Sequence, residues 1–270
     1  MKRWSVEQEL STEVVGVHEV SARLVSGDIA ITATDGPARI EVADVRNGAV
    51  EVTFDDGLLS VSHEQFGEHG RRRGLAWLLG GGPSPAARVT IGVPAGTRVG
   101  ASSVAADMLV AGLTEPVNLK TVSGDITLKD LAERVDARTV SGDVEAFGIA
   151  GDLNVGTVSG DLAMVNGTCR WLESKTVSGD ILLDLALPRG AVYTVATVSG
   201  DVSLRLPSEP SLIVEAASLS GDLRSDWDIG WESTRPGRRR VRTTLGSGDA
   251  RLVVKTVSGD LQILSKRAAA

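Results

Sequence analysis

The pentapeptide Thr-Val-Ser-Gly-Asp recurs along the chain at nearly constant intervals. It appears at residues 121–125, 139–143, 157–161, 176–180, 197–201 and 256–260, with Ser-Leu-Ser-Gly-Asp at 218–222 and a degenerate copy at 103–107. From Asp107 to Asp222 the repeat aspartates are 18, 18, 18, 19, 21 and 21 residues apart. Repetition at a fixed period constrains a fold strongly, because each unit must pack against its copies. A unit this short, without helical periodicity, predicts one coil of a β-solenoid.

The alternation of apolar and polar residues predicts which side chains face the interior. Within residues 122–128 the apolar side chains lie at even positions and the polar ones at odd positions. Strand alternation therefore predicts an inward column of the repeat valines, beginning with Val122, and an inward Gly124. The parity of the apolar residues changes before Val140, which predicts a corner near residues 138 and 139.

The same alternation places the repeat aspartates in a column on the outside, about 4.8 Å apart. Two carboxylates at that spacing repel by roughly 0.9 kcal/mol in water. One explanation is that each aspartate caps its own turn by accepting backbone N–H bonds, with Ser and Thr hydroxyls as further donors. A second explanation is that the column binds cations or a basic partner. A third is that it supplies catalytic carboxylates. The candidate metal ligands are Asp125, Asp143, Asp161, Asp180 and Asp201.

Composition limits the classes of function. The net charge of −7 argues against broad nucleic-acid binding. The single cysteine, Cys169, allows no internal disulfide and no Cys-based zinc cluster, and we expect it to be a small buried residue. The sequence shows neither a signal peptide nor an apolar run of about 20 residues, which predicts a cytoplasmic protein.

Residues 1–98 alternate less regularly and predict an irregular β cap of the same solenoid, with a loop insertion at 66–87. A cap is needed because an open solenoid end exposes unpaired strand edges. Residues 24–31 form an early copy of the repeat, and Asp56-Gly57 predicts a hairpin over 50–61. Residues 99–264 form the regular solenoid, and 265–270 a frayed tail.

Two segments combine arginine with tryptophan in this acidic chain, one within 66–87 and one inserted at 224–242. Each predicts either a flap that binds a protein partner or an anionic membrane surface, or a cap that folds over the solenoid. The candidate partner-binding residues are Arg71, Arg72, Arg73, Trp77, Trp227, Trp231, Arg238, Arg239 and Arg240.

The sequence contains no recognisable catalytic or cofactor motif. The spacing of His63 and His69 does not fit the zinc-protease motif, and no histidine follows residue 69 to complete a Ser-His-Asp triad among the repeats. We therefore expect no enzyme and no cofactor. A polysaccharide-cleaving β-helix is the catalytic alternative, but it needs distinct acid and base carboxylates, whereas the repeat aspartates look equivalent.

The Thr-Val-Ser-Gly-Asp repeats, with the lead-in Val-Pro-Ala-Gly-Thr at 93–97, resemble the bacterial putative-adhesin family of β-strand repeats, also called the toastrack group. The resemblance covers about residues 20–264. It implies a single-stranded, right-handed parallel β-helix. Members of the family are described as adhesin-like, or as sensing or scaffold domains attached to membrane segments in envelope-stress systems. The resemblance implies no catalytic residue.

The sequence therefore predicts an all-β protein, a single-stranded parallel β-helix with 18–21-residue coils. We expect a non-catalytic, adhesin-like binding or scaffold protein, linked to envelope-stress signalling. The expected contacts are a protein partner and the inner membrane surface through the basic loops, together with homo-oligomer formation. The alternatives are a filament built by end-to-end stacking of the coils and a glycan-active enzyme.

Overall fold

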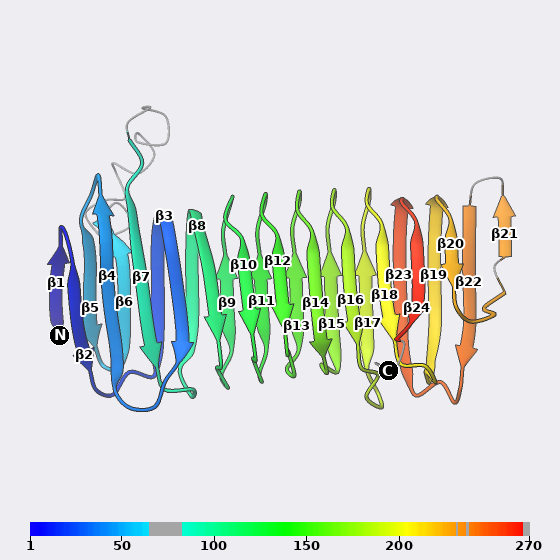
Figure 1. Ribbon diagram of the computed structural model, residues 1–270, viewed down its shortest axis with the longest axis horizontal. Helices are drawn as coiled ribbons and strands as arrows, with labels where there is room; N and C mark the ends of the chain where they lie inside the picture. Colours follow the sequence, from blue (N-terminus) through cyan, green and yellow to red (C-terminus); the bar gives the residue numbers. More distant parts are fainter. Residues whose placement is uncertain (65–82, 231, 236–237, 267–270) are drawn as a thin grey trace. The chain divides into compact units, whose positions relative to one another are not determined.

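The described part of the chain is built from β-strands. The computed structural model describes residues 1–64, 83–230, 232–235 and 238–266 (Figure 1). None of these residues lies in an α-helix, so no described helix is long and apolar enough to cross a membrane. The chain divides into two compact units, Met1–Thr127 and Leu128–Ala270.

The first unit is organised around two long parallel strands, β3 (Glu19–Ala33) and β8 (Arg98–Ala111). They pair in register, with Asp28 beside Asp107, which confirms the early copy of the repeat. The first half of β3 also pairs with β6 (Leu58–His63) and its second half with β7 (Ala86–Val93), both in parallel. β9 (Val117–Lys120) adds a parallel neighbour to β8.

Antiparallel strands extend this unit beyond β6 and β7. β5 (Val50–Asp55) and then β1 (Lys2–Val6) follow β6, whereas β4 (Ala38–Arg46) and then β2 (Leu10–Val14) follow β7. The turn between β5 and β6 has positive φ at both Asp56 (45°) and Gly57 (78°). Two such residues are what a tight hairpin requires, so the hairpin predicted over 50–61 is confirmed.

In the second unit each coil supplies one strand to each of two parallel ladders. The first ladder contains, in spatial order, β11 (Val135–Arg138), β13 (Leu153–Gly156), β15 (Trp171–Lys175), β17 (Val192–Ala196), β23 (Ala250–Ser258) and β19 (Leu212–Ser220). The second contains β12 (Val144–Phe147), β14 (Leu162–Gly167), β16 (Ile181–Leu185), β18 (Val202–Leu206), β24 (Leu261–Ser265) and β20 (Leu223–Ser225). β10 (Ile126–Lys129) spans the boundary between the two units in sequence. This stack of parallel coils is the predicted β-solenoid.

The last coil of the sequence is not the last coil of the stack. β23 pairs with β17 on one side and β19 on the other, and β24 lies between β18 and β20 (Figure 1). β22 (Arg238–Leu245) covers the outer edge of β19 in antiparallel pairing, and β21 (Glu232–Arg235) pairs with β22. The chain therefore skips one position, forms β19 to β22, and returns to fill the gap.

The repeat valines face outward, so the predicted inward column was wrong. Val158 is 45% exposed, whereas the preceding Thr157 is buried at 6%. The physical reason lies at the corner, where the valine and the following serine both project outward and shift the alternation by one residue. The inward hydroxyl of Thr157 donates to the carbonyl oxygen of Gly142 (3.2 Å). Those of Thr197 and Thr256 are buried without a hydrogen-bond partner among the described residues.

The repeat glycines lie where neighbouring coils approach most closely. A Cβ added at Gly179 would lie 2.0 Å from the carbonyl oxygen of Gly160, and one added at Gly160 would lie 2.1 Å from that of Gly142. No other residue fits such a gap without moving the backbone. This agrees with the inward glycine predicted from the sequence.

Candidate functional site

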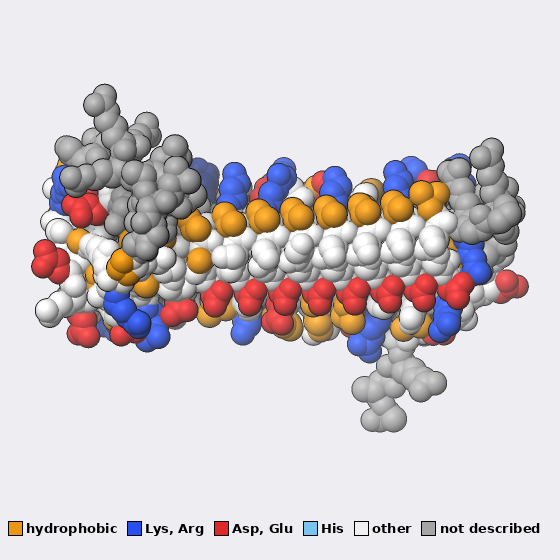
Figure 2. Space-filling view, turned by 90° about the horizontal axis from the view of Figure 1, so that it is seen from above, with side chains coloured by type: hydrophobic (Ala, Val, Ile, Leu, Met, Phe, Trp, Pro, Cys, Tyr) orange, Lys and Arg blue, Asp and Glu red, His pale blue; other side chains and the backbone are white. Residues whose placement is uncertain are grey.

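The corner that carries the repeat presents three parallel rows of side chains in the second unit (Figure 2). In spatial order the valine row is Val140, Val158, Val177, Val198, Val257 and Leu219, the serine row is Ser141, Ser159, Ser178, Ser199, Ser258 and Ser220, and the aspartate row is Asp143, Asp161, Asp180, Asp201, Asp260 and Asp222. We call these rows together the repeat face. In Figure 2 they run as neighbouring orange, white and red lines.

The aspartate row is held by hydrogen bonds between coils. Asp143 Oδ1 accepts the backbone N–H of Asp161 (2.8 Å), and Asp161 Oδ1 accepts that of Asp180 (2.8 Å). The same bond joins Asp180 to Asp201, Asp201 to Asp260, and Asp260 to Asp222. These bonds offset the repulsion between neighbouring carboxylates. The structure therefore agrees with aspartates that accept backbone N–H bonds, although the donor belongs to the next coil rather than to the same turn.

The predicted metal ligands are divided between the two units. Asp125 belongs to the first unit, where its N–H donates to Asp107 Oδ1 (2.9 Å), and the other four lie in the aspartate row. Among the described residues, no group of three or more His, Cys, Asp or Glu side chains is arranged to hold a metal ion. Cation binding by these aspartates stays a prediction.

An arginine occupies the end of the aspartate row. Asp222 belongs to the last coil of the stack, and its Oδ1 contacts Nη2 of Arg239 from β22 (2.8 Å). At the other aspartates Oδ1 accepts the backbone N–H of the next coil. Asp222 has no next coil, and the Arg239 guanidinium contacts its Oδ1 instead. The structure brings Arg239, a predicted partner-binding residue, into contact with the row itself.

The other predicted partner-binding residues are dispersed. Arg71, Arg72, Arg73, Trp77 and Trp231 lie outside the described residues. Trp227 is half-buried just after β20, and its N–H donates to Ser225 Oγ (3.1 Å). Arg238 and Arg240 lie on β22, which covers the edge of β19, so the β22 part of this Arg-Trp segment forms a cap.

The sequence reasoning missed a row of basic side chains beside the valine row. In the first ladder Arg138, Gly156, Lys175, Ala196, Lys255, Ala217 and Arg240 are neighbours across successive strands. We call this the basic row, because a cation alternates with a small residue along it. The available signal was the residue two positions before each repeat valine, which is Arg, Gly, Lys, Ala and Lys at Val140, Val158, Val177, Val198 and Val257.

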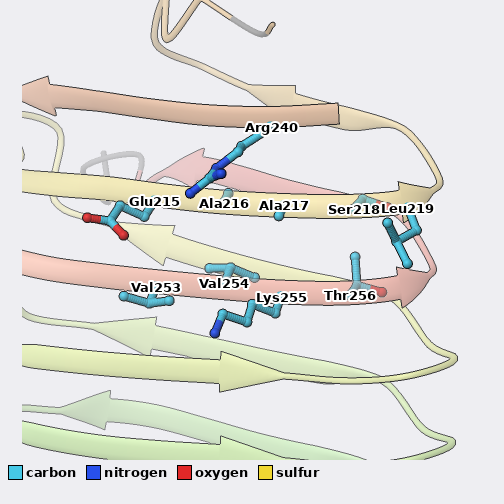
Figure 3. A pocket seen from close by; sticks show the side chains of 10 residues that line it. All are labelled: Glu215, Ala216, Ala217, Ser218, Leu219, Arg240, Val253, Val254, Lys255 and Thr256. Carbon is cyan, nitrogen blue, oxygen red and sulfur yellow. The ribbon is translucent and has the colours of Figure 1, made fainter. Parts of the chain in front are cut away.

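A small residue leaves a hollow between two of the cations. This hollow, of about 300 Å³, lies on β22, β19 and β23, and its lining includes Arg240, Ala217 and Lys255 (Figure 3). Glu215 also lines it and contacts Arg251 Nη2 (3.0 Å) and Arg242 Nε (3.6 Å). The Glu215 carboxylate of the lining is therefore already paired with two arginines, and Arg240 and Lys255 add positive charge.

The single cysteine is not a nucleophile in this arrangement. Cys169 is fully buried, as expected, and burial raises the pKa of its thiol to about 11. The thiol therefore stays protonated at neutral pH.

Comparison with known proteins agrees with this architecture. The model of the family described as Toastrack DUF4097 matches residues 82–264, which is more than half of the chain. The chain belongs to the Toastrack DUF4097 family. This confirms the resemblance seen in the repeats. No curated protein matches this Toastrack chain.

Solved structures share the Toastrack chain's fold at low sequence identity. A putative lipid binding protein from Parabacteroides distasonis is 12% identical, with 96% of this chain and 97% of that chain covered and a TM-score of 0.54. A putative adhesin from Bacteroides fragilis is 14% identical, with 97% of each chain covered and a TM-score of 0.50. A putative adhesin from P. distasonis is 13% identical, with 98% and 97% covered and a TM-score of 0.50. The comparisons show the family and the fold, and they assign no reaction.

Proposed function

We propose that this Toastrack chain is a non-catalytic scaffold that binds a protein through its repeat face and the adjoining basic row. The valine row carries this proposal. Its six side chains are 43–48% exposed, whereas the threonine and glycine of the same repeat face inward and let the coils stack. Contiguous exposed apolar side chains are typical of interaction surfaces.

The regularity of the repeat face supports binding rather than catalysis. Five of the six aspartates of the row contribute Oδ1 to the same hydrogen bond, and Asp222 at its end contributes Oδ1 to Arg239, so no pair of carboxylates is set apart as an acid and a base. A glycan-cleaving site needs two carboxyl groups in different environments. The repeat face connects the strands of the two ladders, so it is ordered before its partner binds. This lowers the entropic cost of binding.

Finer parts of the proposal rest on the sequence. They are an adhesin-like role, a cytoplasmic location, a link to envelope-stress signalling, and contact between the Arg-Trp segments and the inner membrane surface. The structures from Parabacteroides and Bacteroides share the fold at 12–14% identity, so their described roles supply the analogy for the adhesin-like part alone.

Site-specific photo-cross-linking tests the proposal. The photoreactive amino acid p-benzoylphenylalanine replaces Ser178 in the serine row or, as a matched control, exposed Glu145 on β12 of the other ladder. After irradiation in an extract of host cells, mass spectrometry identifies the linked chains. We expect a specific protein adduct from position 178 and none from 145. Equal labelling at both positions, or no adduct at 178, would contradict binding through the repeat face.

A further inference from the structure

The basic row is a periodic surface with the same axial repeat as the aspartate row. Arg138, Lys175 and Lys255 are exposed and lie in every second strand of the first ladder, and exposed Arg240 follows at the same interval on β22. Neighbouring strands are about 4.8 Å apart, so successive cations are about 10 Å apart along the stack. The aspartates recur in every coil. Because both rows belong to the same coils of the second unit, the spacing of the cations stays twice that of the aspartates along the stack.

The four rows are arranged symmetrically across the surface. Each basic position precedes its valine by two residues, as Lys175 precedes Val177, and each aspartate follows its serine by two residues, as Asp180 follows Ser178. The order across the surface is therefore basic, valine, serine, aspartate. Figure 2 shows blue side chains beyond the orange row and the red row on the other side of the white one.

We propose that the partner of the repeat face is a second copy of this chain, related by a two-fold axis that runs parallel to the rows between the valine and serine rows. The rotation places the basic row of each copy opposite the aspartate row of the other, and each valine row opposite a serine row. A two-fold interface of this kind is self-complementary, because each contact occurs twice. This inference rests on the proposed function and names the partner for it.

A second copy fits this surface better than another charged polymer. Its carboxylates have the coil spacing of the basic row, whereas a polymer with a different repeat loses register after a few coils. Isolated exposed ion pairs contribute little, but an aligned series around a desolvated apolar row contributes more than its separate members. Lys175 already contacts Glu173, and Arg240 lies on β22, beyond the last coil that carries an aspartate, so Arg138 and Lys255 are the main cations of the interface.

The end of the aspartate row shows that an arginine and the coil-to-coil bonds coexist. Asp222 contacts Arg239 Nη2 through Oδ1, while its own N–H still donates to Asp260 Oδ1 (2.7 Å). A guanidinium can therefore approach this row without breaking the bonds that hold the coils. Asp161 and Asp180 use Oδ1 for the next coil, and both side chains are exposed to a cation of the partner copy.

Sedimentation velocity of the full chain over a concentration series tests the pairing. We expect a monomer–dimer equilibrium that weakens as ionic strength rises. R138E/K255E in the basic row and V177S/V198S in the valine row should each raise the dimer Kd at least tenfold. The matched control R170E/R224E, which reverses two exposed arginines outside the basic row, should stay within about twofold of the wild type.

The geometry has its own test. Ser178 lies next to the two-fold axis, so S178C should form an intermolecular disulfide under mild oxidation, whereas E145C should not. Buried Cys169 should not compete. A wild type that is monomeric at all concentrations, or a Kd that the row variants leave unchanged, would overturn the second-copy inference. Species that grow without limit would do so as well, in favour of end-to-end filaments.

The outcomes also separate this inference from the function on which it rests. A photo-adduct at position 178 that contains a second copy supports both. An adduct with a different protein, together with a monomeric wild type, overturns the second-copy inference and leaves the binding scaffold standing. The absence of any adduct, together with a monomer, overturns both.

Discussion

At the residue scale, each six-residue segment from the basic position to the aspartate, such as 138–143, both stacks the coils and forms the surface. The threonine and glycine face inward and let the coils stack, whereas the basic residue, valine, serine and aspartate face outward and determine the surface. The inward glycine could be predicted from the sequence. The outward valine could not, because period-two alternation takes no account of a corner at which two successive residues project outward.

The close approach of the coils predicts that a Gly→Ala substitution is strongly destabilising at the repeat glycines and tolerated at a glycine whose neighbours leave more room. G179A places a Cβ 2.0 Å from a backbone oxygen, so we expect it to lower the free energy of unfolding by at least about 1–3 kcal/mol. G156A is the matched control, because its Cβ would lie 3.6 Å from the oxygen of Lys175, an ordinary contact. Urea denaturation followed by circular dichroism compares them. Equal stability of the two variants would refute the steric account.

The bonds between aspartates predict that shape matters more than charge in this row. D180A removes the acceptor for the N–H of Asp201 and should cost about 1 kcal/mol, whereas D180N keeps an oxygen at that position and should cost less. The same denaturation measurement distinguishes them. If D180N is as destabilised as D180A, the carboxylate charge rather than the accepted hydrogen bond stabilises the row.

At the element scale, local signals predicted some strand connections, and pairing between distant strands determined the rest. Asp56-Gly57 predicted the β5–β6 hairpin because both residues adopt positive φ readily. The basic row had no signal of this local kind, because its residues lie up to 117 positions apart in sequence and meet only through register. The candidate site was therefore predicted in its aspartates and, among its cations, only in Arg239 and Arg240.

A buried histidine on β6 predicts acid sensitivity of the first unit. His63 is fully buried, its Nδ1 accepts the N–H of Val25 (2.9 Å), and burial lowers its pKa to about 4. The unfolded chain, with a pKa near 6.5, takes up the proton first. This contribution to stability is present above about pH 6.5 and is lost as pH falls to about 4, for a total of up to about 3 kcal/mol.

Thermal unfolding between pH 7 and pH 4.5 checks this dependence. In H63N an amide oxygen can replace Nδ1 as acceptor without titrating, so its stability should fall less across this range than that of the wild type. Parallel slopes for the two proteins would assign the acid sensitivity to other groups.

At the scale of the whole molecule, the second unit shows that order in sequence and order in space differ. The 38 residues from Asp222 to Asp260 are compatible with two further coils or with an excursion, and no local pattern decides between them. The structure contains an excursion, β21 and β22, followed by a coil that returns between two earlier ones. The fold class was thus predictable from the repeat, but the order of its last coils was not.

The position of the returning coil predicts that core substitutions in it destabilise the protein more than those in the preceding coil of the sequence, although it lies closer to the C-terminus. Leu261 and Leu223 occupy the same column in neighbouring strands, but Leu261 lies between two coils and Leu223 in the last coil of the stack. L261A should therefore cost about 2–5 kcal/mol, and L223A less, although Leu261 is closer to the chain end. Chemical denaturation measures both. A larger loss in L223A would show that the returning coil contributes less than its position indicates.

The returning coil also links folding to synthesis. Residues 250–265 fill the next-to-last position of each ladder, yet the ribosome makes them after every strand that flanks them. A nascent chain can assemble its early coils as they emerge, but the position between β17 and β19 stays open until residues 250–265 have been made. A chain terminated before residue 250 therefore lacks an inner layer of this unit rather than its outermost one.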